Sequence, residues 1–83
     1  MIVVRFFASL REQLGTGELR LALEASLTVD QLIEQLAAEH GETWRSALNA
    51  PQLIVAINQQ VANRATRLVD GDELALFPPV TGG

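Results

Sequence analysis

The residues best suited to chemistry lie in the last seven positions, Phe77-Pro78-Pro79-Val80-Thr81-Gly82-Gly83. The two prolines fix φ and cannot donate to a sheet ladder, so they hold the backbone extended. Gly82 and Gly83 lack a Cβ and can enter a channel that is too narrow for any other residue. A terminal Gly-Gly arises by chance in about one chain in two hundred at ~7% glycine usage. We therefore predict that the unhindered Gly83 carboxylate is the functional group.

Few side chains elsewhere in the sequence could catalyse a reaction. The sequence contains no cysteine and no tyrosine, and all six basic residues are arginines. Disulfides, thiolate metal sites and thiol nucleophiles are therefore excluded, and so is Schiff-base chemistry on lysine. His40 is the single histidine, and its place at the end of a predicted helix favours a structural role over a ligand or catalytic role. These exclusions give more weight to the C-terminal carboxylate.

Length, composition and charge set the class of protein. The 83 residues form one small domain, predicted at 1–77 and followed by an extended, flexible tail at 78–83. An apolar fraction of 48% is enough for a real core, and the net charge of −4 argues against binding a nucleic-acid backbone. No segment approaches the ~20 apolar residues that span a bilayer, and the first residues lack the features of a signal peptide. We expect a cytoplasmic protein that binds neither nucleic acid nor membranes.

The elements that position the C-terminus begin with a predicted strand at 2–8, which is rich in β-branched and aromatic residues. Its core face is expected to hold Ile2, Val4, Phe6 and Ala8. Phe7 falls on the opposite face and should point away from the core. A short helical turn is expected at 9–14. Residues 18–24 alternate as a second strand, and the short connection predicts an antiparallel pair.

The strongest helix signal follows these strands. Thr28 and Gln31 have the spacing of a capping box, in which each side chain satisfies a backbone N–H of the first turn. An apolar stripe at helical spacing comprises Val29, Leu32, Ile33, Leu36, Ala37 and His40. Gly41 is placed to end the helix. The sequence thus predicts one amphipathic helix with a single buried face.

The second half of the sequence is predicted to return to strands. Residues 42–48 are ambiguous and compatible with a short helical turn, in which Trp44 covers one end of the core. A continuous apolar run at 53–57 indicates a strand that is covered on both faces. A turn at 58–60 leads to a short return strand that starts at Val61.

The last strand is predicted at 73–77, after a turn at Asp70-Gly71-Asp72. The carboxylates of this turn and of Glu73 provide too few oxygen ligands for a Ca²⁺ loop, so we expect no metal site there. A solvated acidic turn, or a contact for a basic partner, fits them better.

The predicted elements assemble into an α+β fold, with one main helix packed across a mixed sheet. Strands 2–8 and 73–77 both carry strongly apolar core faces and are expected to be central neighbours. Phe7 and Phe77 then lie side by side on the face opposite the helix, together with Val61. Exposed phenylalanines imply a covering partner, and a loop folded over them is the alternative.

Five segments carry a resemblance to a known family. They are Val4-Arg5-Phe6-Phe7-Ala8, the capped helix start at 28–32, Val55-Ala56-Ile57-Asn58-Gln59, Asp70-Gly71-Asp72-Glu73, and the ending from Phe77 to Gly83. With these motifs the chain resembles the ubiquitin-like, β-grasp sulfur carriers, and within them the small subunits of molybdopterin synthase. Many relatives share a bare Gly-Gly, whereas the Phe-Pro-Pro-Val-Thr-Gly-Gly ending is typical of this subfamily.

The resemblance implies a reaction cycle centred on Gly83. An adenylating enzyme related to ubiquitin-activating enzymes would use ATP and Mg²⁺ to convert the Gly83 carboxylate to an acyl-adenylate. Sulfur from a persulfide enzyme would replace AMP and leave a thiocarboxylate. The large synthase subunit, in a heterotetramer, would receive the tail and supply the acid–base residues and the pocket for the pyranopterin substrate. The isolated domain is expected to bind no cofactor of its own.

The resemblance also implies roles for individual residues. Gly83 would carry first the adenylate and then the sulfur, and Gly82 would thread a narrow channel in the partner. The expected partner-binding residues are Phe7, Val61, Phe77, Pro78, Pro79, Val80 and Thr81. Arg11 and the acidic turn at 70–73 are weaker candidates for polar contacts at the border of that surface.

Two alternatives stay open from the sequence. One is a related carrier that supplies sulfur for thiazole, cysteine or tRNA thiolation. The other, of a different class, is a ubiquitin-like modifier or interaction module that carries no sulfur. Reconstitution with candidate acceptors separates the first alternative, and the mass of the C-terminal peptide separates the second.

Overall fold

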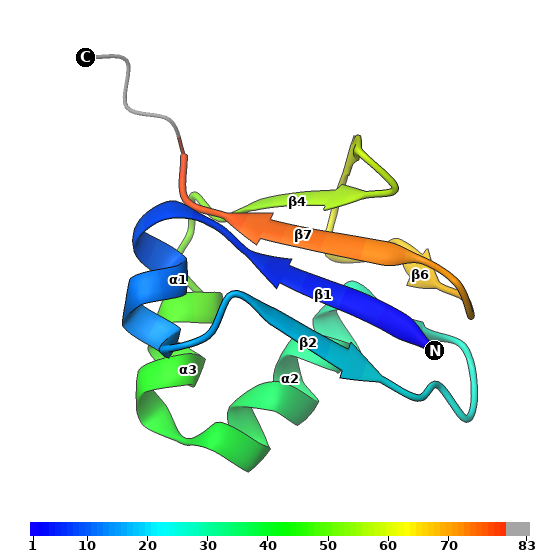
Figure 1. Cartoon of the computed structure of the whole chain (residues 1–83), viewed down its shortest axis with the longest axis horizontal. Helices are drawn as coiled ribbons and strands as arrows, with labels where there is room; N and C mark the ends of the chain where they lie inside the picture. Colours follow the sequence, from blue (N-terminus) through cyan, green and yellow to red (C-terminus); the bar gives the residue numbers. More distant parts are fainter. Residues whose placement is uncertain (80–83) are drawn as a thin grey trace.

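A mixed five-stranded sheet organises the chain in this computed structural model, which describes residues 1–79. The strands are β1 (Ile2–Phe6), β2 (Glu18–Leu21), β4 (Ile54–Ile57), β5 (Gln60–Ala62) and β7 (Glu73–Phe77). Their order in the sheet is β2-β1-β7-β4-β5, and only β1 and β7 run parallel to each other (Figure 1). The predicted antiparallel pairing of the first two strands is confirmed, and so is the pairing of the first strand with the last.

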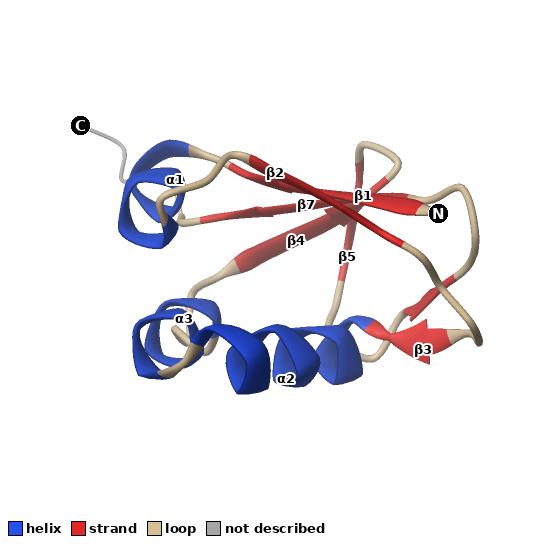
Figure 2. Ribbon diagram, turned by 60° about the horizontal axis from the view of Figure 1, so that its bottom comes forward, coloured by secondary structure: helices blue, strands red, loops and turns tan. Residues whose placement is uncertain are grey.

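Helices lie mainly on one face of this sheet. They are α1 (Ala8–Leu14), α2 (Val29–His40) and α3 (Glu42–Leu48). Figure 2 shows α2 and α3 across one face of the sheet and α1 at its end. Beside α2, a second sheet pairs the two short strands β3 (Leu27–Thr28) and β6 (Arg67–Leu68). The predicted α+β class is confirmed, with α2 as the one long helix. No helix within residues 1–79 has the length and hydropathy to cross a membrane.

The helix α2 begins and ends where the sequence predicts. The Gln31 N–H donates to Thr28 Oγ1 over 3.1 Å, and the Thr28 N–H donates to Gln31 Oε1 over 2.9 Å, which completes the capping box. Gly41 follows the last turn with φ +96°, a conformation that glycine adopts without strain. The buried residues of α2 are Val29, Leu32, Ile33, Leu36 and Ala37, as the stripe predicts.

His40 departs from the predicted apolar stripe. Its side chain is exposed and stacks on Trp44, with ring centroids 3.8 Å apart and planes 13° apart. Trp44 itself is 7% exposed and meets Phe6 edge to face, with centroids 5.4 Å apart. The last turn of α2 therefore extends past the core, and Trp44 closes that end of the core as predicted.

The core lies between the inner face of the sheet and the helices. Its fully buried side chains are Ile2, Val4, Phe6, Val29, Ile33, Leu36, Leu48, Leu68, Leu74 and Leu76. The strands β1 and β7 contribute alternate residues, because successive side chains of a strand point to opposite faces. Within residues 1–79 no polar or charged residue is buried, so apolar packing holds the core together.

Four predicted strand boundaries are wrong, and one of them is the start of β5, which lies at Gln60 rather than at Val61. The strand β1 ends at Phe6, because Ala8 takes a left-handed φ of +55° and starts α1. Ala8 is consequently exposed and does not join the core face. The strand β2 ends at Leu21 rather than at residue 24, since the chain leaves the sheet there to reach β3 beside α2. The strand β4 begins at Ile54 rather than at residue 53.

Hydrogen bonds join the β4–β5 turn to the turn that precedes β7. Asn58 and Gln59 form the β4–β5 turn with φ of +51° and +69°, a region that asparagine tolerates better than most residues. Asn58 Nδ2 donates to Asp72 Oδ1 over 2.9 Å, and the Glu73 N–H donates to Asn58 Oδ1 over 3.0 Å. The Val69 N–H donates to Asp72 Oδ2 over 2.9 Å. Both Asp72 oxygens therefore serve the fold, and they fix the start of β7 against β4.

The two faces of β7 predict losses of stability of different size for neighbouring substitutions. Leu76→Ala removes a fully buried side chain and should lower the free energy of unfolding by about 2–5 kcal/mol. Phe77→Ala removes a half-buried side chain from the other face and should lower it by only about 1 kcal/mol. Urea unfolding of both variants measures the difference. Equal losses would mean that Phe77 belongs to the core.

Candidate partner-binding face

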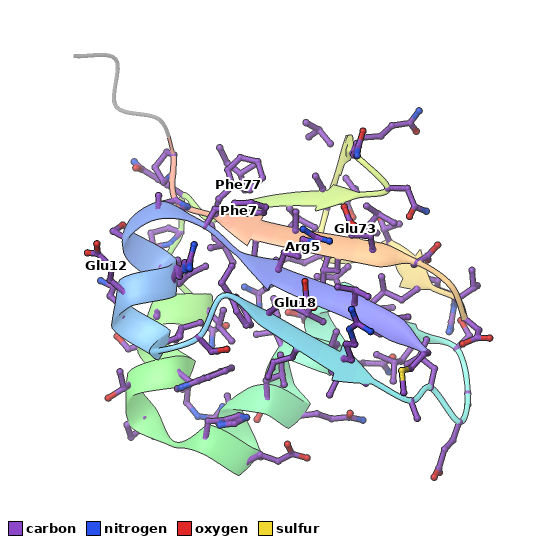
Figure 3. All side chains as sticks on the ribbon, viewed as in Figure 1. Arg5, Phe7, Glu12, Glu18, Glu73 and Phe77 are labelled. Carbon is purple, nitrogen blue, oxygen red and sulfur yellow. The ribbon has the colours of Figure 1, made fainter. Side chains whose placement is uncertain are left out.

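Six apolar side chains share the face of the sheet that lies opposite α2. They are Phe7, Ile54, Ala56, Val61, Ala75 and Phe77, and we call them the outer patch. The strand register sets Ala56 between Ala75 and Val61, and it sets Ile54 beside Phe77. Phe7 follows β1 directly, and the parallel pairing of β1 with β7 brings it next to Phe77 (Figure 3). The outer patch thus contains residues from both the first and the last part of the domain's sequence.

The phenylalanine pair and Val61 are the most accessible parts of the outer patch. The rings of Phe7 and Phe77 meet edge to face, with centroids 6.1 Å apart and planes at 88°. Phe7 is 44% exposed and Val61 is 82% exposed. With such exposure, no loop within residues 1–79 covers Phe7 or Val61, so the alternative of an internal cover by this part of the chain is wrong for Phe7. The predicted position of all three residues on the outer face is confirmed, and their contact with a partner stays a prediction.

Backbone hydrogen bonds hold Phe7 in this position. Its N–H donates to the Leu76 carbonyl over 3.2 Å, which extends the β1–β7 ladder by one bond. Its carbonyl accepts from the Arg11 N–H over 3.4 Å, which begins the hydrogen bonding of α1. Between these two bonds, the left-handed Ala8 turns the chain away from the sheet. This conformation costs a non-glycine residue roughly 1–2 kcal/mol, so the surrounding bonds must hold Ala8 in place.

Charged side chains border the outer patch on the β2 side. Arg5 lies between two carboxylates, with its Nε 3.2 Å from Glu73 Oε2 and its Nη2 3.7 Å from Glu18 Oε1 (Figure 3). Arg20 Nε lies 3.3 Å from Glu18 Oε2 and extends the row. These pairs are partly exposed and contribute little to stability. Their effect is to divide the outer face into an apolar half over β7, β4 and β5 and a charged half over β1 and β2.

The predicted C-terminal site falls at the limit of the described structure. Pro78 and Pro79 follow β7 directly and are half-buried. Four further predicted positions lie outside the described residues, namely Val80, Thr81, Gly82 and Gly83. The roles of all six residues stay predictions.

The acidic turn is largely occupied within the domain. The Asp70 carboxylate pairs with the N-terminal amine of Met1, and the two Asp72 oxygens accept the bonds from Asn58 and Val69 described above. Glu73 pairs with Arg5. Each of these three carboxylates therefore has a partner within the domain, while the Asp70 side chain stays 75% exposed.

Three residues of the outer patch were not singled out as site residues from the sequence. Ile54, Ala56 and Ala75 lie at its centre, where the register of β4 and β7 sets them side by side. The period-two alternation of each strand was the signal that could have found them, because every second residue from Phe77 falls on its face. The pairing partner and register of β4 were needed as well, and no local pattern provides these.

The described residues give no sign of acid–base or metal chemistry at this face. No group of three or more His, Cys, Asp or Glu side chains in residues 1–79 is placed to hold a metal ion. The pKa of the Arg45 guanidinium is raised by its hydrogen bond to Glu34 and by attraction to the same carboxylate, but this pair joins α3 to α2 on the helical side. The outer patch itself holds no ionisable side chain.

Residues 4–83 match the ThiS family. The chain belongs to this family. It is 43% identical to the molybdopterin synthase sulfur carrier subunit of Escherichia coli (strain K12), and the alignment covers 100% of both chains. The resemblance on which the sequence interpretation rests is confirmed.

Solved structures of similar chains have the same fold as this ThiS-family chain. The crystal structure of SAMP1 from Haloferax volcanii matches with a TM-score of 0.76 at 29% identity, over 99% of this chain and 98% of that chain. A chain of the protein-protein complex of subunits 1 and 2 of molybdopterin-converting factor from Helicobacter pylori 26695 matches with a TM-score of 0.66 at 26% identity, over 99% of this chain and 97% of that chain. The predicted ubiquitin-like β-grasp fold is confirmed.

The aromatic pair of this ThiS-family chain should show a measurable coupling in stability. Edge-to-face aromatic pairs stabilise a protein by about 0.5–1.5 kcal/mol beyond the effect of their buried area. For two partly exposed rings we expect a coupling energy near the lower end of this range. A double-mutant cycle with Phe7→Leu and Phe77→Leu, followed by urea unfolding, gives the coupling energy. The matched cycle of Phe7→Leu with Val61→Ala should give a value near zero. Equal coupling in both cycles would contradict a specific contact between the two rings.

Proposed function

We propose that this chain is the sulfur carrier subunit of molybdopterin synthase. The observation that carries the proposal is the 43% identity, along the full length of both chains, to a relative of that name. The family match also extends to residue 83, so it includes the Gly-Gly ending. The absence of cysteine and lysine from the sequence fits a carrier that holds sulfur on its C-terminal carboxylate.

The proposed cycle begins with activation of the Gly83 carboxylate. A carboxylate is a poor acyl electrophile, so a leaving group must first be attached. Transfer of AMP from ATP, with release of pyrophosphate, gives the acyl-adenylate in the active site of an adenylating partner, which uses Mg²⁺. The outer sulfur of an enzyme persulfide then attacks the carbonyl carbon and AMP leaves, which gives an acyl disulfide. A second thiol attacks the donor-enzyme sulfur of this S–S bond, so that the thiocarboxylate is released on Gly83 and a disulfide forms on the donor.

The second half of the cycle passes this sulfur to the pyranopterin. In the large subunit, the thiocarboxylate sulfur forms a bond to a carbon of cyclic pyranopterin monophosphate while a C–O bond at that carbon breaks. Water then hydrolyses the resulting thioester, which returns the Gly83 carboxylate and leaves the sulfur on the pterin as a thiolate. Two such transfers complete the dithiolene of molybdopterin. The acid–base residues and the substrate pocket belong to the large subunit in this proposal. The chain is therefore an enzyme subunit that supplies the sulfur donor and part of the interface.

The outer patch is the proposed docking surface for the large subunit. Its Phe7 and Val61 side chains are exposed, it is apolar, and it lies next to the end of β7, after which Pro78 and Pro79 lead toward Gly83. The Helicobacter pylori complex of subunits 1 and 2 supports an assembly of this kind, because it contains a chain of the same fold. The adenylating partner and the persulfide enzyme are proposed on chemical grounds alone, and so is cytoplasmic residence.

A second candidate function is protein modification without sulfur. It is favoured by 32% identity over 88 residues to small archaeal modifier protein 3 of Haloferax volcanii. In that function the activated Gly83 carbonyl would form an amide with an amine of another protein. Related carriers for thiazole, cysteine or tRNA thiolation share the thiocarboxylate and differ only in the acceptor.

Intact-mass spectrometry tests the proposed chemistry directly. After co-expression with the adenylating and persulfide enzymes, the chain should gain the mass that corresponds to one oxygen replaced by sulfur. Deletion of Gly83 should abolish this gain with an unchanged melting temperature, since the described core ends before that residue. The sulfur should then move to the pyranopterin and not to thiazole, cysteine or tRNA acceptors. An unmodified wild-type carboxylate, or an amide-linked adduct, would contradict the carrier function.

The docking proposal predicts a hot spot at Phe77. Phe77→Ala should weaken binding to the large subunit by about 2–4 kcal/mol, because it removes an aromatic anchor from the outer patch. Val69→Ala is the control, since Val69 is 54% exposed but lies before the acidic turn and outside the outer patch. Titration calorimetry measures both affinities. Equal affinities for the two variants would contradict the assignment of the outer patch as the docking surface.

A further inference from the structure

Arg11 differs from the other arginines in its surroundings. Four arginines form ion pairs with carboxylates, namely Arg5, Arg20, Arg45 and Arg64. Arg67 donates to the Ser26 carbonyl over 3.4 Å. Within residues 1–79, the Arg11 side chain makes neither an ion pair nor a hydrogen bond. Among residues 1–79, Arg11 and Arg67 thus lack a carboxylate partner, and only Arg11 also lacks a side-chain hydrogen bond.

Gly17 makes room for the side chain of Arg11. A Cβ at residue 17 would lie 2.9 Å from Arg11 Nε and 3.3 Å from Arg11 Cδ, closer than such atoms pack. Gly17 is not among the positions with positive φ, so its backbone conformation does not require glycine. The absence of a side chain therefore has a steric role, because it lets the Arg11 side chain lie across the backbone before β2.

This arrangement sets the cation at the border of the outer patch. An open hollow of about 400 Å³ is lined by Arg5, Phe6, Phe7, Arg11, Gly17 and Glu18. Arg5 is neutralised there by Glu18 and Glu73, whereas Arg11 is not. Phe7 of the outer patch shares the same hollow. A partner that covers Phe7 must therefore pass over an unpaired positive charge, on a chain whose net charge is −4.

We propose that Arg11 pairs with a carboxylate of the large synthase subunit, and that Gly17 keeps the guanidinium in position for this contact. The inference rests on the proposed function, because it takes the large subunit as the partner. A carboxylate is the expected counterpart, since the planar guanidinium can donate two parallel hydrogen bonds to it. Charges at the rim of an interface act mainly on the rate of association and on its salt dependence.

The test compares two charge reversals with the same change in net charge. Arg11→Glu should slow association with the purified large subunit roughly tenfold at low salt, with a smaller effect on dissociation. Arg67→Glu, on β6 near α2, should stay within about twofold of the wild type. At about 0.5 M NaCl the two variants should converge, because screening removes the long-range attraction. Stopped-flow fluorescence on Trp44 or on a labelled large subunit gives both rates.

A second variant moves Arg11 without changing any charge. Gly17→Ala adds one methyl group, which the flexible Arg11 side chain can avoid only by leaving its place across residue 17. It should slow association in the same direction as Arg11→Ala, with an unchanged melting temperature. Gly17→Ala in an Arg11→Ala background should then have no further effect. An additional loss in that background would show that Gly17 acts independently of Arg11.

The outcomes separate this inference from the proposed function. If the wild type binds and Phe77→Ala weakens binding, but Arg11→Glu associates as fast as Arg67→Glu, only the role of Arg11 is overturned. If the wild type fails to bind the large subunit, the proposed function fails and the inference fails with it. If Arg11→Glu slows association and a single carboxylate-to-lysine change in the large subunit restores it, the ion pair is established.

Discussion

The parallel pairing of β1 with β7 is the constraint on which both the core and the outer patch depend. It sets Phe6 beside Leu76 in the core, and one residue further along it sets Phe7 beside Phe77 on the outer face. Parallel strands end at the same edge of a sheet, so the start of α1 and the segment after β7 leave the sheet together. An antiparallel pairing of the same strands would place the two rings at opposite edges. The contact therefore depends on topology as much as on residue type.

This pairing also explains how one strand of a very small domain separates the residues that stabilise the core from the residues of the proposed binding surface. Leu74 and Leu76 point into the core and are fully buried, whereas Ala75 and Phe77 alternate with them on the outer face. The core face of β7 is apolar, and the proposed function assigns partner binding to its outer face. At the start of β7, the bonds from Asn58 fix the register, and so they fix which residues reach each face.

Local patterns predicted the parts of this fold that local physics determines. The capping box of α2, its stripe and the alternation of β1 and β7 all follow from the spacing of residue types, and the structure contains them. The left-handed turn at Ala8 and the β3–β6 pair could not be predicted, because alanine disfavours that conformation and two-residue strands have no period. The relation between Arg11 and Gly17 is likewise tertiary. A glycine between a helix and a strand indicates a turn, and only the folded structure shows that it leaves room for a side chain.

The proposed cycle requires the carrier to bind one partner, leave it and bind another, and the composition of the outer patch suits such exchange. Ala56 and Ala75 are small residues at the centre and Ala56 is only 7% exposed, so most of the affinity must come from the aromatic pair at one side and Val61 at the other. Larger residues at the centre would bury more apolar surface and slow dissociation, because changes in affinity act mostly on that rate. Rim charges can quicken the encounter at little cost to release, since they act mainly on association. Fast exchange thus favours small side chains at the centre of the surface and an unpaired charge at its border.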